Sequence, residues 1–300
     1  MLDINRVLKE DRLLRAFTGL NRKAFDQLSQ GFSIVLKQEA IACSLKHRKR
    51  AVGGGRKARL QRVEDKLFFI LFYFKCYPTF DVAGLLFDLH RSRAQRWMLR
   101  LQPLLEKVLE KKMALPERKL ESIEEFMVRF PYAKEVMIDG TERPIQRPTD
   151  QKKQKNHYSG KKKCHTRKHL VMSDQDKRVL VLTKAREGKV HDKRQLNEAK
   201  LVDFVPDKLP IHVDLGFQGL QKEFVNIKIP DKKPRGKELS EEQKQSNREK
   251  SSTRVKCEHT ISGIKRYKAA ATVYRNHIRD LDDCFMLTAA GLWNFYLMAA

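Results

Sequence analysis

Two aspartates, Asp139 and Asp214, each follow a short apolar run and precede a glycine within two residues. Such runs are typical of strands, and the end of a rigid strand can project side chains into a shared site. Two carboxylates held close together repel each other, and a divalent cation removes that cost. Oxygen ligands without histidine or thiol partners favour Mg²⁺ or Mn²⁺. The alternative is that each aspartate only caps a turn.

A third carboxylate, Glu258, lies in a segment whose periodicity predicts the opening of a helix. Arg254 precedes it by four residues and Lys265 follows it by seven, so all three share one face of that helix. This face offers a metal ligand beside two cations that can bind phosphate. The alternative is a surface ion pair, which contributes little to stability.

A second candidate site lies in the first hundred residues, where the pattern is helical. Thr79 is expected to cap one helix, and Ser92 the next after a short turn. The second helix has a predicted buried stripe, Ala94, Trp97, Met98 and Leu101, and an opposite polar face, Arg93, Gln95, Arg96 and Arg100. This arrangement indicates a helix-turn-helix that reads DNA, and the alternative is a helical bundle with a solvated basic face.

The charge of the chain favours a nucleic-acid partner. The net charge is +26 at pH 7 and the sequence pI is about 10.0, so a polyanion is needed to relieve the self-repulsion. A basic run between Lys152 and Lys168 contains Lys161, Lys162 and Lys163 and is predicted to contact the phosphate backbone. The alternatives are a solvated surface for this run and an anionic membrane for the whole chain, although no lipidation motif is present.

The ordered blocks resemble those of one enzyme family. They are Asp139-Gly-Thr, Asp214-Leu-Gly-Phe-Gln-Gly, the helix with Arg254, Glu258 and Lys265, Tyr158-Ser-Gly-Lys-Lys-Lys and Tyr77-Pro-Thr-Phe. Together they resemble DDE-superfamily transposases, above all bacterial insertion-sequence transposases of family five, relatives of Harbinger-type elements. The resemblance covers roughly residues 60 to 300. One departure is Ser251, which stands where a related pattern has a tyrosine.

The resemblance implies an RNase H-like core, with the first two acids on strands and the glutamate on a helix. It also implies phosphoryl transfer with two divalent cations held by Asp139, Asp214 and Glu258, while Arg254 and Lys265 hold phosphates. Water would free a 3′-hydroxyl at the element end, and that hydroxyl would attack target DNA. The expected function is therefore a transposase that binds the ends of an insertion sequence and catalyses strand cleavage and strand transfer.

Two other functions remain open from the sequence. One is a catalytically inactive or domesticated DNA-binding derivative, and the other is an endonuclease that cuts without rejoining. The expected partners are terminal inverted repeats and target DNA, with a homo-oligomer, a dimer, assembled on them. Neither a membrane nor a small-molecule substrate is expected.

The order of predicted strands and helices favours an α/β or α+β domain preceded by an all-helical domain. The resemblance implies that this domain is α/β, an RNase H-like mixed sheet with helices. The predicted divisions are residues 1–59, a helical segment and a linker with Gly53, Gly54 and Gly55; 60–115, the helix-turn-helix; and 130–300, the catalytic domain. Strands are predicted at 135–138, 168–172, 179–183, 211–214 and 225–229, and Asp192 is expected to cap a helix.

The termini and cysteines bear on location. The amino-terminal residues lack the apolar core of a secretory signal, and the apolar tail from Cys284 is short for a membrane span, which predicts a buried terminal helix. The five cysteines are scattered without a Cys-x-x-Cys pair, which is typical of a reducing cytoplasm. The expected location is the bacterial cytoplasm, in association with the nucleoid.

Overall fold

The computed structural model describes residues 2–44, 57–234, 236 and 238–299. The chain forms two compact units. The helical unit comprises Met1–Leu115, Lys265–Ala270 and Gly291–Ala300, and the sheet unit comprises Pro116–Ile264 and Ala271–Ala290. The glycine linker predicted around Gly53 to Gly55 lies outside the described residues.

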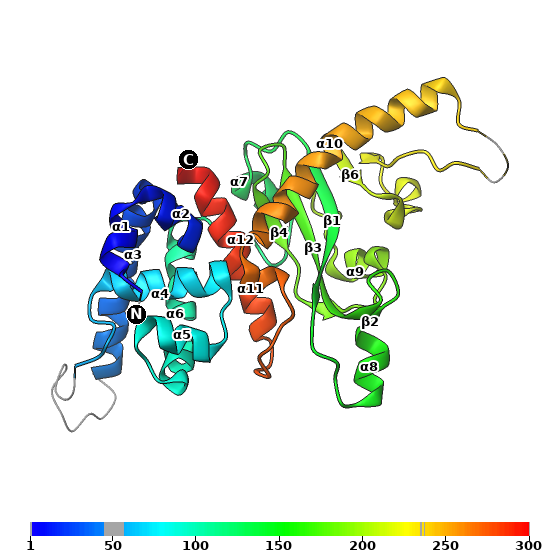
Figure 1. Ribbon diagram of the computed structural model, residues 1–300. Helices are drawn as coiled ribbons and strands as arrows, with labels where there is room; N and C mark the ends of the chain where they lie inside the picture. The colour runs from blue at the N-terminus through cyan, green and yellow to red at the C-terminus, as the bar shows by residue number, and fades with distance from the viewer. Residues whose placement is uncertain (1, 45–56, 235, 237, 300) are drawn as a thin grey trace. The chain divides into compact units, whose positions relative to one another are not determined.

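The helical unit confirms the helices predicted for the first hundred residues (Figure 1). Asn21 precedes one of them and its side chain accepts a hydrogen bond from the Ala24 N–H at 2.7 Å. One helix is buried along eight consecutive residues, 67–74, and so forms the centre of the unit. The described helices of this part are α1 (Ile4–Lys9), α2 (Asp11–Thr18), α3 (Arg22–Ser44), α4 (Val63–Cys76), α5 (Phe80–Phe87) and α6 (Arg91–Lys111).

Helices α5 and α6 form the expected helix-turn-helix. Thr79 caps α5 as predicted, accepting from the Val82 N–H at 3.3 Å. The cap predicted for α6 was wrong: His90 is the cap and Ser92 is the second helical residue, because the His90 ring nitrogen takes the place of a hydroxyl acceptor. Of the predicted stripe, Ala94, Met98 and Leu101 are buried, whereas Trp97 is half-buried.

The sheet unit contains a mixed sheet, which confirms the predicted α/β class. The strands lie in the order β2-β3-β1-β6-β7, and β4 and β5 also pair with β3. Strand β1 is antiparallel to β3 and parallel to β6, and β6 is parallel to β7. The strands are β1 (Val136–Pro144), β2 (Tyr158–Ser159), β3 (Cys164–Asp174), β4 (Val179–Leu182), β5 (Arg186–Glu187), β6 (Ile211–Val213) and β7 (Ile227–Lys228).

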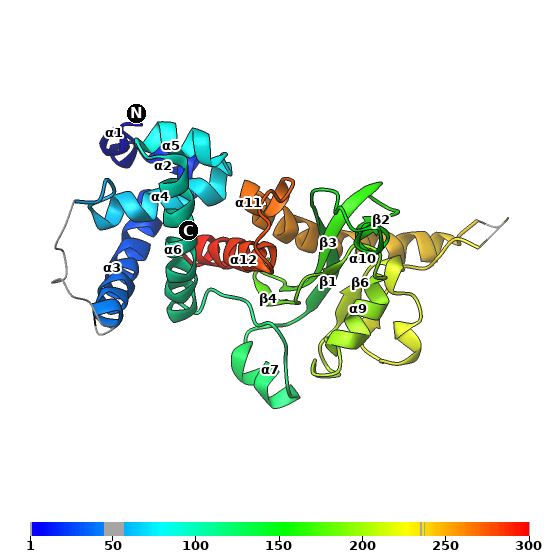
Figure 2. The same cartoon turned by 90° about the horizontal axis from the view of Figure 1, so that it is seen from below.

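Helices cover the sheet, with α9 and α10 on opposite faces (Figures 1 and 2). Since side chains alternate along a strand, β1 serves both faces. Val136 and Ile138 pack with Leu196 of α9 in the main core cluster, and Met137 and Asp139 project to the other face. The remaining helices are α7 (Ile123–Arg129), α8 (Gln151–His157), α9 (Asp192–Ala199), α10 (Glu241–Lys265), α11 (Lys268–Ala271) and α12 (Leu281–Ala299).

Three local predictions need correction. Strand β1 continues past Asp139 to Pro144, because β3 supplies hydrogen-bonding partners along that whole length. Asp192 is the first residue of α9 and His191 is its cap, with the imidazole accepting from the Lys193 N–H at 3.3 Å. Glu258 does not open a helix, since α10 already begins at Glu241 and incorporates the charged stretch before it.

The apolar tail forms α12, and the prediction of a buried terminal helix is confirmed by Phe285, Met286 and Ala289, all of which are fully buried. Its first residues belong to the sheet unit and those from Gly291 to the helical unit. Within the described part of the chain, no helix is both long and apolar enough to cross a membrane.

Candidate active site and DNA-binding helix

The two predicted aspartates lie side by side because β1 and β6 are parallel. Met137 pairs with His212 and Ile138 pairs with Val213, so the next positions of the register are Asp139 and Asp214. Adjacent strands are about 4.8 Å apart. Both side chains project to the face opposite the main core cluster, since they are two residues beyond Met137 and His212.

Each aspartate accepts a hydrogen bond from the following backbone N–H, from Gly140 to Asp139 and from Leu215 to Asp214, at 2.7 Å in both cases. Burial raises the pKa of the Asp139 carboxyl, and the negative charge of Asp214 raises it further. The Gly140 N–H and the charges of Arg254 and Lys161 oppose this rise in the pKa. The pair therefore concentrates negative charge in a partly dehydrated place.

Helix α10 packs against this face of the sheet. The Lys256 ammonium contacts Glu135 at 2.7 Å, and the Thr260 hydroxyl donates to the Lys177 carbonyl at 3.2 Å. On the same helix, Arg254 Nη1 lies 3.3 Å from Asp214 Oδ1. Arg254 of α10 therefore contacts one member of the aspartate pair directly.

The rotation of α10 turns Cys257 toward the sheet. Its side chain is buried, and burial together with the charge of Asp139 raises the pKa of the thiol to about 12. Glu258 is the next residue along the helix and is exposed, while Lys265, the last residue of α10, is half-buried. The structure thus brings Asp139, Asp214 and Arg254 together, and Glu258 stands at the exposed side of the same helix turn.

The ligand chemistry suits a hard divalent cation at the aspartates. Both offer carboxylate oxygens, and the mutual repulsion of the pair is the feature that a cation relieves. Among the described residues, no group of three histidine, cysteine, aspartate or glutamate side chains is close enough to hold a metal ion. Glu258 therefore does not complete a group of three carboxylates with the two aspartates in this structure.

A buried ion-pair cluster beneath the aspartates was not predicted. Lys168 of β3 contacts Asp192 at 2.8 Å and Glu142 at 3.6 Å. A Cβ atom on Gly140 would lie 3.2 Å from the Asp192 carboxylate, so the glycine leaves room for that acid. The glycine after Asp139 was visible in the sequence, but the acid that it accommodates comes from a helix remote in sequence.

The three predicted lysines, Lys161, Lys162 and Lys163, are exposed in the loop between β2 and β3. Lys161 is near enough to the aspartates for its charge to lower the pKa of Asp139. Tyr158 of the same hairpin is exposed and meets the His165 ring edge-on at 5.7 Å. The hairpin of β2 and the start of β3, residues 158–165, is called the basic hairpin, and it lies in the sheet unit together with the aspartates.

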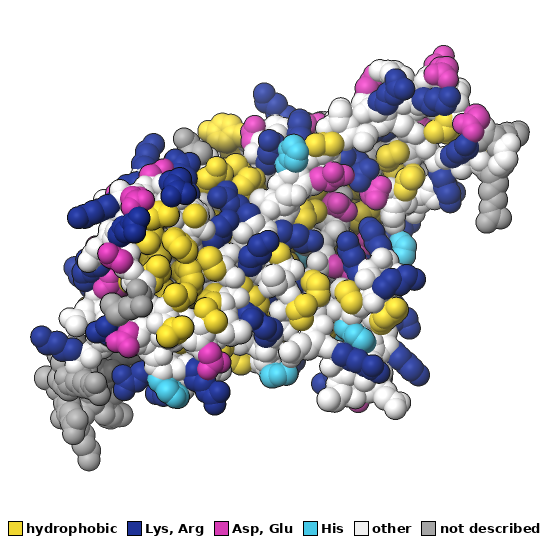
Figure 3. Space-filling model, viewed as in Figure 1, with side chains coloured by type: hydrophobic (Ala, Val, Ile, Leu, Met, Phe, Trp, Pro, Cys, Tyr) yellow, Lys and Arg dark blue, Asp and Glu magenta, His cyan; other side chains and the backbone are white. Residues whose placement is uncertain are grey.

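All four residues of α6 that are predicted to contact DNA bases are exposed. They are Arg93, Gln95, Arg96 and Arg100. Arg96 bonds back to the Ser92 carbonyl at 3.2 Å, and Arg100 pairs with Glu39 at 3.0 Å. Two adjoining cavities of about 630 and 360 Å³ lie between this face and residues 57–59. Lys and Arg side chains are also spread over the face seen in Figure 3, with hydrophobic and acidic side chains between them.

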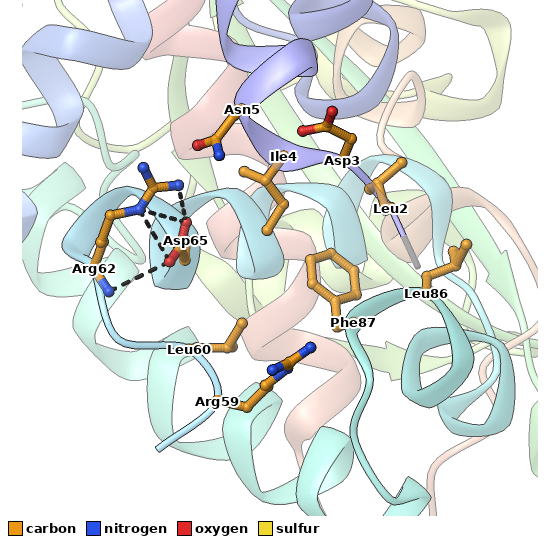
Figure 4. Close-up of a pocket in the computed structure, with 10 residues that line it drawn as sticks. All are labelled: Leu2, Asp3, Ile4, Asn5, Arg59, Leu60, Arg62, Asp65, Leu86 and Phe87. Atoms are coloured by element: carbon orange, nitrogen blue, oxygen red, sulfur yellow. Dashed lines mark hydrogen bonds and ion pairs between the residues drawn. The ribbon is translucent and has the colours of Figure 1, made fainter. Parts of the chain in front are cut away.

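Another cavity of the helical unit is lined by none of the site residues that the sequence predicted. It measures about 360 Å³ and lies among the start of α1, the residues before α4 and the end of α5 (Figure 4). Arg62 and Asp65 form a fork of hydrogen bonds at its edge, with the shortest at 2.6 Å. These contacts cap the start of α4, so the polar side chains at the edge of this cavity have a structural role.

Comparison with known proteins gives matches to both regions. A family model described as DDE superfamily endonuclease matches residues 138–294, and a model described as the helix-turn-helix of DDE superfamily endonuclease matches residues 58–111. The chain is 29% identical over 288 residues to a protein of Microchaete diplosiphon named probable transposase for insertion sequence element IS702, and the alignment covers 95% of each chain. No solved structure matches.

Proposed function

Because the chain belongs to the DDE superfamily of endonucleases, we propose that it is the transposase of an insertion sequence, which cleaves the element ends and joins them to target DNA. The observation that carries this proposal is the parallel register that sets Asp139 beside Asp214, with Arg254 of α10 against the pair. The family depends on divalent metal and the helix-turn-helix binds DNA. These two features match the acidic pair and the basic face of α6.

In this proposal, Asp139, Asp214 and Glu258 hold two divalent cations, Mg²⁺ or Mn²⁺. Bound cations would stabilise charge on the attacking and leaving oxygens of an in-line phosphoryl displacement. Arg254 and Lys265 bind phosphates of the reacting strand, since guanidinium and ammonium groups both donate to phosphate oxygens. The lysines of the basic hairpin bind the phosphate backbone of the DNA at positions farther from the reacting phosphate.

The face of α6 with Arg93, Gln95, Arg96 and Arg100 recognises the terminal inverted repeats in the major groove. Two element ends must be brought together, so a homodimer on DNA is the proposed active form. The protein would act on the nucleoid in the bacterial cytoplasm, where both the element and its targets are found.

The test is a cleavage and strand-transfer assay with labelled element ends in Mg²⁺. Asp139→Asn, Asp214→Asn and Glu258→Gln are each expected to reduce cleavage by more than about 100-fold. The reason is that even changes to residues that only support a metal ligand reduce metal affinity or activity by about 10–100-fold. Binding to element ends should remain. The matched control is Glu242→Gln, which removes an exposed carboxylate from the first turn of the same helix.

The products decide between the proposed transposase and a simple endonuclease. Joined target DNA supports the transposase, whereas cut ends that are never joined support the endonuclease. Cleavage that survives all three substitutions would contradict the assigned acids. A protein that binds the ends but never cuts them would be an inactive derivative.

A further inference from the structure

The side chain of Arg254 lies against the aspartate pair of the sheet unit, Asp139 and Asp214. Its Nη1 atom is 3.3 Å from Oδ1 of Asp214, which stands beside Asp139 in the parallel register of β1 and β6. Only 19% of the side chain is exposed, so the contact is partly shielded from water. One guanidinium therefore places a positive charge against the aspartate pair.

The aspartates themselves cannot relieve their repulsion by hydrogen bonding alone. Each accepts a hydrogen bond from its own following N–H, and neither of these bonds links the two side chains. Arg254 forms an ion pair with Asp214 and stands on the helix that also carries Glu258.

We infer that Arg254 is a built-in substitute for the divalent cation: it neutralises the metal-free aspartate pair and must be displaced when metal binds. This inference rests on the proposed metal site. A guanidinium is always charged, so the substitution operates at every physiological pH. Its long stem allows the charged group to leave the pair without any movement of the helix backbone.

Displacement makes the same guanidinium available to DNA. An arginine that leaves Asp214 can donate two parallel hydrogen bonds to a phosphate at the edge of the site. Metal binding and phosphate binding are then coupled through one side chain, and each favours the other. The arrangement lowers metal affinity in the absence of DNA and raises it when a phosphate has engaged Arg254.

The test measures Mn²⁺ binding to the full chain without DNA, by the loss of the free-ion electron paramagnetic resonance signal. Arg254→Gln and Arg254→Met are both expected to bind Mn²⁺ about tenfold more tightly than the wild type, because a competing unit charge is removed from the site. Arg254→Lys, which keeps the charge, should stay near the wild type. Arg248→Gln is the control, since it removes an exposed charge from the same helix.

A thermal melt of each variant in EDTA and in Mn²⁺ accompanies the binding experiment. The neutral variants should gain more thermal stability from Mn²⁺ than the wild type does, since their aspartates have lost the substitute cation. Equal or weaker Mn²⁺ binding by both neutral variants overturns the inference. Tighter binding by Arg248→Gln of the same size also overturns it, because net charge alone would then explain the effect.

Asp139→Asn and Asp214→Asn separate this inference from the proposed function. If these changes abolish Mn²⁺ binding and the neutral Arg254 variants do not tighten it, the metal site stands and the substitute role fails. If Mn²⁺ binds wild type and neutral Arg254 variants without dependence on either aspartate, the proposed metal site fails too. If neither the wild type nor any Arg254 variant binds Mn²⁺, both fail together.

Discussion

Lys265 is the last residue of α10, two helical turns after Glu258, and its side chain is half-buried. If it holds a phosphate near the metals, its charge matters most as negative charge develops in the transition state. We expect Lys265→Ala and Lys265→Met to slow cleavage or joining by about 100-fold, the cost of removing one such electrostatic interaction. The measurement is a single-turnover assay in Mg²⁺.

Lys265→Met retains most of the aliphatic stem, so it separates the charge from the packing of the side chain. Both variants should melt within a few degrees of the wild type. The control is Lys244→Ala, in the first turn of α10, which should remain fully active. Full activity of both Lys265 variants would remove this residue from the site, and a collapsed melting temperature would make its role structural.

At the scale of elements, helix α6 offers the clearest DNA-binding test. Arg93 and Arg96 are exposed on the face opposite the buried residues Ala94 and Met98. We expect Arg93→Ala and Arg96→Ala each to weaken binding to element ends by about 1–3 kcal/mol, the usual effect of removing a side chain that contacts a base. Gel-shift titrations against element ends and scrambled DNA would measure both affinity and specificity.

A matched control is available on α6 itself. Lys107 lies about two helical turns beyond Arg100 on the same side of the helix, so Lys107→Ala removes one positive charge from outside the predicted reading residues. It should change the affinity for element ends and for scrambled DNA by the same small factor. Normal end binding by both Arg93→Ala and Arg96→Ala would support an ordinary bundle helix.

The first turn of α12 is held to β3 by Asp283. Its carboxylate accepts hydrogen bonds from Arg118 at 2.6 Å, from the Ala185 N–H at 2.8 Å and from His169 at 3.0 Å. Burial by itself raises the pKa of Asp283, but the His169 hydrogen bond and the Arg118 charge outweigh it and hold the pKa well below its usual range. The ionised carboxylate therefore stabilises the fold.

Because the folded-state pKa of Asp283 is lowered, its stabilisation is complete above the unfolded pKa of about 3.9 and is lost as the pH falls through the folded value. Asp283→Asn should reduce the free energy of unfolding at pH 7 by about 3 kcal/mol, since Arg118 keeps an uncompensated charge. Urea unfolding of the wild type and the variant from pH 7 down to pH 3 measures this difference.

The difference between wild type and Asp283→Asn should shrink below about pH 4, where the stabilisation from the wild-type carboxylate begins to fall. Asp207→Asn, an exposed aspartate of the same unit, should show little difference at any pH. A gap for Asp283→Asn that stays constant down to pH 3 would contradict the assigned ionisation.

At the scale of the whole molecule, the net charge of +26 makes DNA binding depend steeply on salt. Replacement of Lys161, Lys162 and Lys163 together by alanine should make the plot of log affinity against log salt shallower, by about 0.9 for each phosphate that these lysines neutralise. Fluorescence anisotropy from low to physiological salt measures the slope. The control replaces Lys208, Lys222 and Lys228, three exposed lysines of the same unit.

The two triple variants carry the same net charge, so only the position of the lysines differs between them. A shallower slope for the hairpin variant alone supports phosphate binding by the basic hairpin. Equal slopes for the two variants would show that the run of lysines is a solvated surface.

Several features follow from the sequence because they depend on neighbouring residues. Helical periodicity and capping side chains, such as Thr79 and Asn21, predicted the helical unit. The apolar runs before Asp139 and Asp214 predicted two strands that contain or lead into the acids, and the ordered blocks indicated the family. Local signals of this kind involve atoms only a few bonds or one helical turn apart.

Only the tertiary structure decided how these elements meet. The parallel register that puts Asp139 beside Asp214, the rotation of α10 that turns Cys257 inward and leaves Glu258 exposed, and the contact of Arg254 with Asp214 all join segments remote in sequence. The cluster of Lys168, Asp192 and Glu142 is of the same kind. Strand pairing and helix rotation are fixed by packing between distant segments, and no local pattern of residue types specifies that packing.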